Sequence, residues 1–212
     1  MNTTPKKMWR LGILSVVAFQ LLLGFSPAAP NEPSFTTIDF PGATFTVAFA
    51  INPAGKINPA GQIVGLYFDA NDVGHGFLLS NGSFTTIDFP GATSTTAFGN
   101  NSAGEIVGQY FDANDVSHGY LLRQGSFTTI DFPGATYTQA SGINPKGEIV
   151  GFYADTGGTL HGFLLSKGGF TSIDFPGAVN TLNFWNTPGD AMVGLYDSAD
   201  GKSHGFLRTT HR

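Results

Sequence analysis

The sequence predicts an all-β protein built as a four-bladed β-propeller. The first observation is a repeat, because His75, His118, His161 and His204 each lie 43 residues from the next. The second is that every repeat holds four short segments rich in β-branched and aromatic residues, separated by Gly- and Pro-containing turn sequences. The third is that no region after the first thirty residues keeps the 3.6-residue period of an amphipathic helix. Four strands in about 43 residues is the size of one propeller blade, so four repeats predict four blades.

The four strands of a blade are expected in a constant order. In the third repeat they lie at "ASGIN" (Ala140 to Asn144), "IVGFY" from Ile149, "HGFLL" from His161 and "FTSIDF" from Phe170. These segments are dominated by residue types that are enriched in strands. We therefore expect each blade to begin at the A-x-G-I-N strand and to end with "FTTIDF".

Pro and Gly mark the turns between these strands. The last Phe of each "FTTIDF" is followed by Pro-Gly, which suits a turn. Asn-Pro-x-Gly suits a type I turn. In the first repeat "INPAGKINPAG", from Ile51 to Gly61, doubles a six-residue unit, so that Asp39 precedes Asp88 by 49 residues. A blade that tolerates six added residues is expected to carry this turn on its surface.

The first 28 residues are expected to be a signal peptide. A basic start, "KKMWR", precedes the largely apolar stretch Leu11–Phe25, and "SPAAP" supplies small residues for cleavage after Ala28. An uncleaved membrane anchor is the alternative, although the apolar stretch is short for a span of about 20 residues. The expected location is therefore extracellular or periplasmic.

The remaining residues, 29–212, are expected to form a single propeller domain with repeats at approximately 34–82, 83–125, 126–168 and 169–212. This region starts with "SFTTIDF", whereas the last repeat ends on "HGFLRTTHR" without a following "FTTIDF". We expect Ser34–Phe40 to pair with the strand containing His204–Leu207 and so to close the ring, because an open sheet edge exposes unpaired backbone groups. An open β-solenoid and a half-ring that pairs with a second chain are the alternatives.

The charge of the chain excludes some partners. Three of its ten basic residues lie in the signal segment, which leaves seven basic against fifteen acidic residues and a formal net charge of −8. Nucleic acid is not an expected partner, because binding it requires a surplus of Lys and Arg. Anionic membrane surfaces are disfavoured for the same reason. The chain contains no cysteine, so disulfides do not contribute to its stability.

The repeated motifs resemble a known family. "GINPKGEIVGFYADTGGTLHGFLLSKGGFTSIDFPGA", from Gly142 to Ala178, is similar to the HAF repeat of bacterial extracellular proteins, and the resemblance covers nearly all of the region after residue 28. This chain has His-Gly-Phe or His-Gly-Tyr where the family name implies His-Ala-Phe. The resemblance implies secretion and a repeated architecture, and it implies no particular activity.

The repeated histidines and aspartates are expected to be structural. Every blade needs the same internal bond, so repetition alone explains His75, His118, His161 and His204. The "IDF" aspartates, Asp39, Asp88, Asp131 and Asp174, are expected to accept N–H bonds from the turn that follows them. The alternative is a ring of imidazoles near the central axis that holds a divalent ion with Asp69, Asp112 and Asp155. A bound metal or other cofactor is not favoured.

The candidate ligand-binding residues lie mainly in the "FDAND" loops, which carry spare polar side chains and vary between repeats. They are Asp69, Asn71, Asp72, Asp112, Asn114 and Asp115. These loops and the "PGAT" connections are expected at one end of the blades, with the short turns at the other. Trp185, which replaces Ala50, Gly99 and Gly142 of the other repeats, is expected to plug the centre of the ring or to stack on a ligand.

Three classes of function are compatible with these features. The favoured one is a secreted, non-enzymatic binding module for an extracellular glycan or protein, because a propeller presents loops on a rigid ring. A structural or adhesive cell-surface repeat protein is the second. A secreted enzyme acting on polysaccharide is the third, and no catalytic residues are assigned because the repeats contain no asymmetric catalytic motif.

Overall fold

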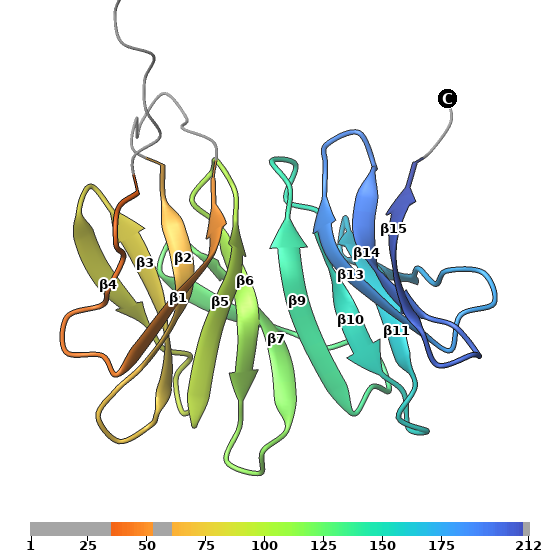
Figure 1. The fold of residues 1–212 in the computed structure, drawn as a ribbon, viewed down its shortest axis with the longest axis horizontal. Coiled ribbons are helices and arrows are strands. Elements are labelled where there is room, and N and C mark those ends of the chain that lie inside the picture. Colours follow the sequence, from red (N-terminus) through yellow and green to blue (C-terminus); the bar gives the residue numbers. More distant parts are fainter. Residues whose placement is uncertain (1–34, 53–60, 210–212) are drawn as a thin grey trace, which may run out of the picture. The chain divides into compact units, whose positions relative to one another are not determined.

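The computed structural model describes residues 35–52 and 61–209, which form fifteen β-strands and no helix (Figure 1). The expected signal peptide and most of the doubled turn lie outside the described residues. In the part of the chain that is described, no helix is long and apolar enough to cross a membrane. The residues from Thr37 onward form one compact unit.

The strands recur with nearly constant length in the four repeats. Their bounds are β1 Phe45–Ile51, β2 Ile63–Phe68, β3 Gly74–Ser80, β4 Ser83–Ile87, β5 Ser94–Asn100, β6 Ile106–Phe111, β7 Ser117–Arg123, β8 Ser126–Ile130, β9 Tyr137–Ile143, β10 Ile149–Ala154, β11 Leu160–Ser166, β12 Gly169–Ser172, β13 Asn180–Asn186, β14 Met192–Asp197 and β15 Ser203–Arg208. The first strand of each blade begins earlier than predicted, since β9 starts at Tyr137 and not at Ala140.

These strands form four antiparallel sheets whose order follows the chain. The first sheet is β1–β4, the second β5–β8, the third β9–β12 and the fourth β13–β15. The predicted fold class is confirmed, because the protein is all-β and the sheets are arranged as the blades of a four-bladed β-propeller. As predicted, each of the first three blades runs from its A-x-G-I-N-type strand to its "FTTI" or "FTS" strand.

A glycine in the second strand of each blade lets an aromatic ring lie flat on the sheet. In β6, a Cβ atom on Gly108 would collide with the carbonyl oxygen of Thr96 and would come within 2.7 Å of the Tyr120 ring. Only glycine fits at such a close approach. The aromatic side chain that covers this position, Phe77, Tyr120 or Phe163, is fully buried in the first three blades.

Neighbouring blades pack through close backbone contacts that repeat from one interface to the next. A Cβ atom on Gly76 would lie 3.3 Å from the amide nitrogen of Ala97, and one on Gly119 would lie 3.2 Å from that of Ala140. The first strands β1, β5, β9 and β13 also contact one another in succession, so they form the inner side of the propeller.

A ladder of asparagine side chains links the same interfaces. Asn52 Nδ2 donates to the Asn101 carbonyl, Asn101 Nδ2 to the Asn144 carbonyl and Asn144 Nδ2 to the Thr187 carbonyl, each at 3.1 Å. The identical distances show that the blades are related by nearly the same step each time. The ladder stops in the fourth blade, where Thr187 stands in place of asparagine.

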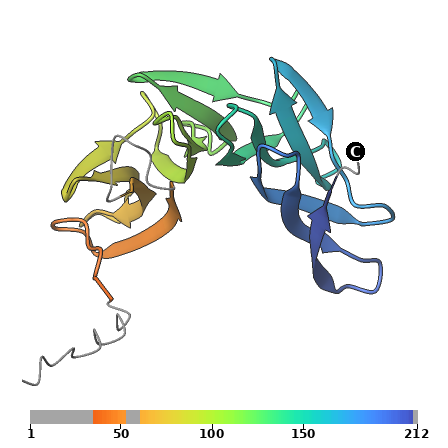
Figure 2. The ribbon, with the colours of Figure 1, turned by 90° about the horizontal axis from the view of Figure 1, so that it is seen from above.

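The predicted closing strand is not formed in the described residues. Residues 35–40 contain no strand, and β15 pairs only with β14, so the fourth sheet has three strands. Seen from above, the four sheets follow an arc (Figure 2). The described strands of the first and fourth sheets have no packing contact comparable to those between successive sheets. Among the described residues, the fourth sheet therefore ends at β15, without the fourth strand that the other sheets have.

Candidate functional site

The loops of the blades are sorted to two opposite ends, as predicted. The "PGAT" loops adjoin the "FDAND" loops, because the Thr44 N–H donates to the Phe68 carbonyl and the Thr93 N–H to the Phe111 carbonyl, both at 2.9 Å. We call this end of the blades the loop end. The opposite end, which carries the Asn-Pro-x-Gly turns and the short "SNG", "RQG" and "SKG" turns, we call the turn end. In Figure 1 the strand β6 points down toward the loop end.

A histidine near the loop end pairs with two aspartates in each of the first three blades. His75 Nδ1 lies 2.9 Å from Asp88 Oδ1, and its Nε2 lies 3.8 Å from Asp69 Oδ2. The equivalent distances are 3.0 and 3.8 Å around His118, and 3.1 and 3.5 Å around His161. Each of these three histidines thus lies between two carboxylates of its own blade, and the structural role of the repeated histidines stays a prediction.

The histidine is also the outer member of an aromatic stack. The rings of Phe89 and Tyr110 are parallel at 3.6 Å, and Tyr110 stacks on His118 at 5.0 Å. The tyrosine hydroxyl hydrogen-bonds the fourth strand, as between Tyr110 and Thr129 at 3.1 Å. Because Phe89 follows Asp88, each "IDF" segment joins two blades, with its aspartate in one and its phenylalanine in the next. Sequence reasoning missed this stack, although the fixed spacing of Tyr, His and Phe in every repeat was a signal for it.

The histidines do not surround the propeller axis. They lie on the third strands β3, β7, β11 and β15, whereas the first strands are innermost. Within the described residues no three His, Cys, Asp or Glu side chains are grouped as metal ligands. The four histidines thus lie on strands outside the inner row, which is not where the alternative of a central ring of imidazoles placed them.

The first aspartate of each "FDAND" loop holds the loop together. Asp69 Oδ1 accepts the N–H groups of Asn71 at 2.8 Å and Val73 at 2.9 Å. These bonds, the one from Val73 first, lower the pKa of Asp69. Asp112 is held in the same way, chiefly by the Val116 N–H, and its pKa is also lowered. Both carboxylates therefore stabilise their own loop, and this local role was not predicted.

The later residues of these loops are directed to solvent. Asp72 and Asp115 sit at the loop tips in the left-handed region, both with φ of 60°. Both are exposed, and neither carboxylate has a hydrogen-bond partner among the described residues. The neighbouring Asn71 and Asn114 are exposed as well. These four side chains are the part of the predicted site that is available to a ligand.

Two hollows lie beside the "PGAT" loops at the same end of the blades. One, of about 200 Å³, is bordered by His118, Asp131 and the loop from Pro133 to Thr136. The other, of about 400 Å³, is bordered by Asp39 and the equivalent loop of the first blade. The loop end thus combines recurring concave surface with exposed carboxylates.

The structure places Trp185 away from this site. It lies near the end of β13 opposite Val193, two residues before the turn Thr187–Asp190, and it is 40% exposed. Since β13 begins at the loop end, Trp185 belongs to the inner side of the fourth blade near the turn end. It is not brought together with Asp72 and Asp115.

The fold and this site define the protein as a β-propeller repeat protein with recurring polar loops. No model of a known protein family matches the sequence, and no curated protein does. The solved structures that are similar in fold include a variant of the Aleuria aurantia lectin in complex with α-methyl-L-fucoside, at 12% identity and a TM-score of 0.47 over 77% of this chain and 56% of the lectin. They also include a triple-arginine mutant of AofleA from Arthrobotrys oligospora, at 14% identity and a TM-score of 0.48 over 82% of this chain and 58% of that one.

A further similar structure is a fungal lectin from Aleuria aurantia described as a six-bladed β-propeller, at 11% identity and a TM-score of 0.45 over 70% of this chain and 54% of the lectin. The chain thus matches a little over half the length of each of these three proteins. These similarities concern the arrangement of the backbone, and no residue role is transferred from them.

Proposed function

We propose that this protein is a binding module that offers the same polar surface on successive blades to a ligand with repeating units, such as an extracellular glycan. The observation that carries the proposal is the recurrence of exposed Asp72 and Asp115 on equivalent loop tips of adjacent blades. Two weak sites on one rigid scaffold bind a repeating ligand more tightly than either site alone. An extracellular protein with a repeating surface is the other partner of this type.

The chemistry of the loop end suits hydroxyl-rich ligands. Free carboxylates accept hydrogen bonds from hydroxyl groups, and O–H···O⁻ bonds are among the strong ones. The side-chain amides of Asn71 and Asn114 supply both donors and acceptors. The hollows beside the "PGAT" loops are the concave surface in which part of a sugar ring could be held.

Secretion belongs to the same proposal. The basic, apolar and small-residue order of residues 1–28 supports export, and a glycan ligand would be met outside the cell. Membership of the HAF-repeat family is proposed on the motifs that the sequence shares with it.

The test is a binding screen of the purified protein against an array of extracellular polysaccharides and oligosaccharides. For any glycan that binds, the double variant Asp72→Ala/Asp115→Ala is expected to weaken binding by about tenfold or more, because charged hydrogen bonds contribute about 1.5–3 kcal/mol. Lys146→Glu, on an exposed turn at the opposite end, is the control and should leave binding unchanged. The proposal fails if the double variant binds normally while Lys146→Glu abolishes binding.

A further inference from the structure

The fourth sheet has the side chains that, in the other blades, contact the fourth strand, but their partners are missing from the described residues. His204 stacks on Tyr196 at 5.0 Å like the other histidines, but its Nδ1 atom faces no aspartate among the described residues. The Tyr196 hydroxyl likewise has no partner within the described chain, whereas Tyr67 and Tyr110 bond Thr86 and Thr129. The open edge is that of β15.

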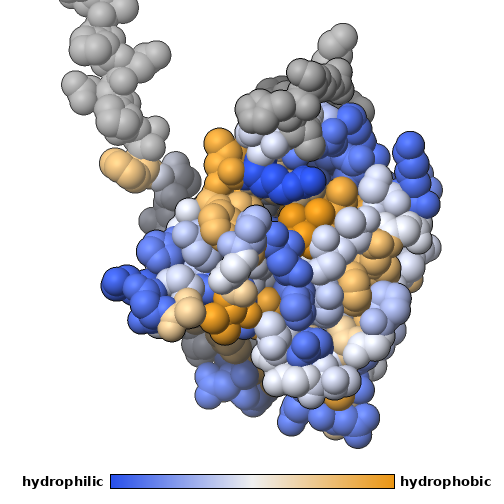
Figure 3. All heavy atoms as spheres, turned by 90° about the vertical axis from the view of Figure 1, so that its right-hand side faces the viewer, coloured by the Kyte–Doolittle hydropathy of each residue, from blue (hydrophilic) through white to orange (hydrophobic). Residues whose placement is uncertain are grey.

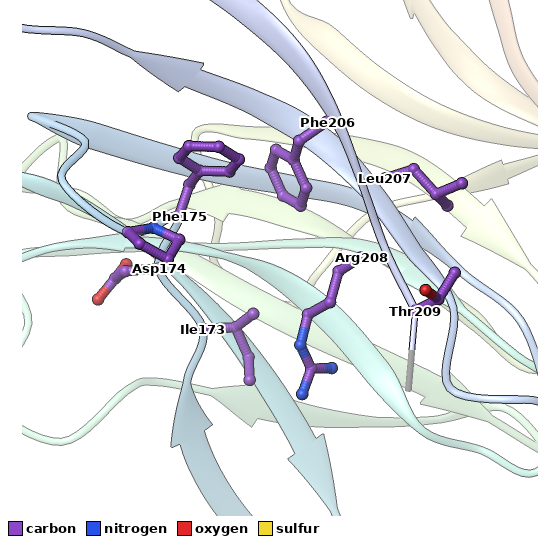
Figure 4. Close-up of a pocket in the computed structure, with 8 residues that line it drawn as sticks. Ile173, Asp174, Phe175, Phe206, Leu207, Arg208 and Thr209 are labelled. Atoms are coloured by element: carbon purple, nitrogen blue, oxygen red, sulfur yellow. The ribbon is translucent and has the colours of Figure 1, made fainter. Parts of the chain in front are cut away.

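A cleft of about 390 Å³ lies beside this edge, lined by Phe175, Phe206 and Arg208 among others. Figure 4 shows the rings of Phe175 and Phe206 next to each other, with Ile173 and Arg208 below them. In the third blade the equivalent rings, Phe132 and Phe163, enclose a third ring, Phe170, at 5.2 and 5.5 Å. The cleft is therefore the place of one more phenylalanine.

The segment 35–40 has the sequence that fits this edge. Residues 34–40 read "SFTTIDF", identical to residues 83–89. With the register of β3 and β4, in which Leu78 faces Thr85, Leu207 would face Thr36. The same register puts Phe35 in the cleft, Thr37 at the Tyr196 hydroxyl and Asp39 at His204.

The sheet faces at the two ends of the arc expose apolar residues that are buried between blades elsewhere in the chain. On the fourth sheet Val193 is 41% exposed, whereas its equivalents Val64, Val107 and Val150 are fully buried. On the first sheet Ile51 is 63% exposed, whereas Ile143 is buried in one cluster with Val107 of the preceding blade. Figure 3, which views the side that carries β13–β15, shows hydrophobic areas on this face between hydrophilic ones.

Gly205 and Ala48 also lack the contacts that their equivalents make with a neighbouring blade. Gly119 lies against Ala140 of the next blade, but a Cβ atom on Gly205 would meet nothing closer than 3.9 Å in the described part of the chain. Its expected counterpart, Ala48, is exposed, although Ala97 and Ala140 are fully buried. One blade face thus lacks a following blade, and the other lacks a preceding one.

We propose that the fourth sheet binds residues 35–40 of a second copy of the chain, so that two copies close one ring of eight blades. Within its own chain the segment is tied to the opposite end of the arc, because Phe40 is held in the first blade. Its ring stacks on Tyr67 at 3.7 Å and its N–H donates to Thr46 Oγ1 at 3.0 Å. Close backbone contacts and the asparagine ladder set the step between blades, so closing the arc within one chain would require these repeated contacts to change.

A second copy satisfies both ends of the arc at once. Its first sheet would follow the fourth sheet of its partner, and the reverse contact would complete the ring. Head-to-tail contacts of this kind close into rings when the rotation allows it. Propeller rings typically contain about four to eight blades, so two four-bladed chains reach the upper end of this range.

Trp185 makes the new interface wider at the inner strands. A Cβ atom on its equivalent Gly142 would lie 2.6 Å from the Phe184 carbonyl of the next blade, so an indole requires more space. Phe49 and Ile51 of the second copy, both exposed, supply apolar side chains to fill that space. The indole then lies in the seam between the copies.

The variant Gly205→Ala is expected to disturb the interface between the two copies without disturbing the fold of the single chain. Among the described residues no atom lies close enough to resist the added methyl group, whereas at Gly119 the same group would be 2.9 Å from the Ile130 carbonyl. We expect the wild-type chain to have twice the mass of one chain in native mass spectrometry, and Gly205→Ala to dimerise at least tenfold more weakly with an unchanged circular dichroism spectrum. A wild-type monomer at all concentrations, or a Gly205→Ala dimer of normal affinity, would overturn the proposal.

Engineered disulfides identify which chain supplies the strand, since the protein has no cysteine of its own. Thr36→Cys and Leu207→Cys, made on separate chains and mixed, should crosslink into a covalent dimer on oxidation. Thr37→Cys with Leu207→Cys is the control, because a shift of one residue turns the side chain to the other face of the strand. If the double variant Thr36→Cys/Leu207→Cys forms its bond within one chain, the segment belongs to the same copy and the proposal is wrong.

Discussion

At the scale of single residues, equivalent positions of the four repeats can be compared to see which side chains the fold requires. Tyr120 occupies the position of Phe77, Phe163 and Phe206, and its hydroxyl is buried without a hydrogen-bond partner among the described residues. Burial also raises the pKa of Tyr120. The other three blades fill the same place with a ring that has no polar atom. The buried hydroxyl of Tyr120 therefore lowers the stability of the fold, and the packing at this position does not require it.

Tyr120→Phe is therefore expected to stabilise the protein by about 1 kcal/mol, since a buried polar group without a partner costs roughly 1–3 kcal/mol. The measurement is the midpoint of urea unfolding. Tyr110→Phe is the matched control and should lower stability, because it removes the bond to Thr129. A loss of stability in Tyr120→Phe would show that the hydroxyl is bonded after all.

At the scale of elements, the "FDAND" loops are closed by ionised carboxylates. The pKa values of Asp69, Asp112 and Asp155 are all lowered from the ordinary value of 3.8, first of all by one backbone N–H in each loop. A carboxyl group with a lowered folded pKa adds stability above its unfolded pKa. That contribution is lost as the pH falls through the folded pKa. The loops should consequently loosen only in acid.

The triple variant Asp69→Asn/Asp112→Asn/Asp155→Asn keeps the acceptor oxygens and removes the titrating groups. We expect its melting temperature to fall less than that of the wild type between about pH 5 and about pH 2. Asp72→Asn/Asp115→Asn is the control and should follow the wild type, because these side chains make no bond in the loop. Equal acid sensitivity of all three proteins would contradict the role given to the loop carboxylates.

Most elements of each blade could be predicted from sequence, because their signals are local. Turn residues such as those of Asn-Pro-x-Gly and the β-branched and aromatic residues of the strands indicate where the strands lie and which end of the blade each loop occupies. The pairing of His75 with Asp88 depends on the register of two adjacent strands, so the sequence could suggest it only through repetition. The place of Trp185 could have been inferred, since it lies two residues before a turn at the end opposite the "FDAND" loops.

At the scale of the whole molecule, the angle between blades could not be predicted. It depends on how closely one sheet approaches the next, at contacts such as those of Gly76 with Ala97 and Gly119 with Ala140. A four-fold repeat by itself is equally compatible with a closed ring and with an arc. The arc leaves one sheet edge open and one strand-forming segment unpaired, and the proposed dimer joins them.

The most direct test of this account is hydrogen–deuterium exchange of the full chain at a concentration where it is dimeric. Residues 35–38 and 84–87 share the sequence "FTTI", so their unprotected amides exchange at similar rates, and their flanking residues distinguish the peptides. Protection reports hydrogen bonding within stable structure. The account predicts that residues 35–38 are protected about as well as β4, and that Gly205→Ala removes this protection without affecting β4. Rapid exchange of residues 35–38 in the wild type, beside a protected β4, would contradict it.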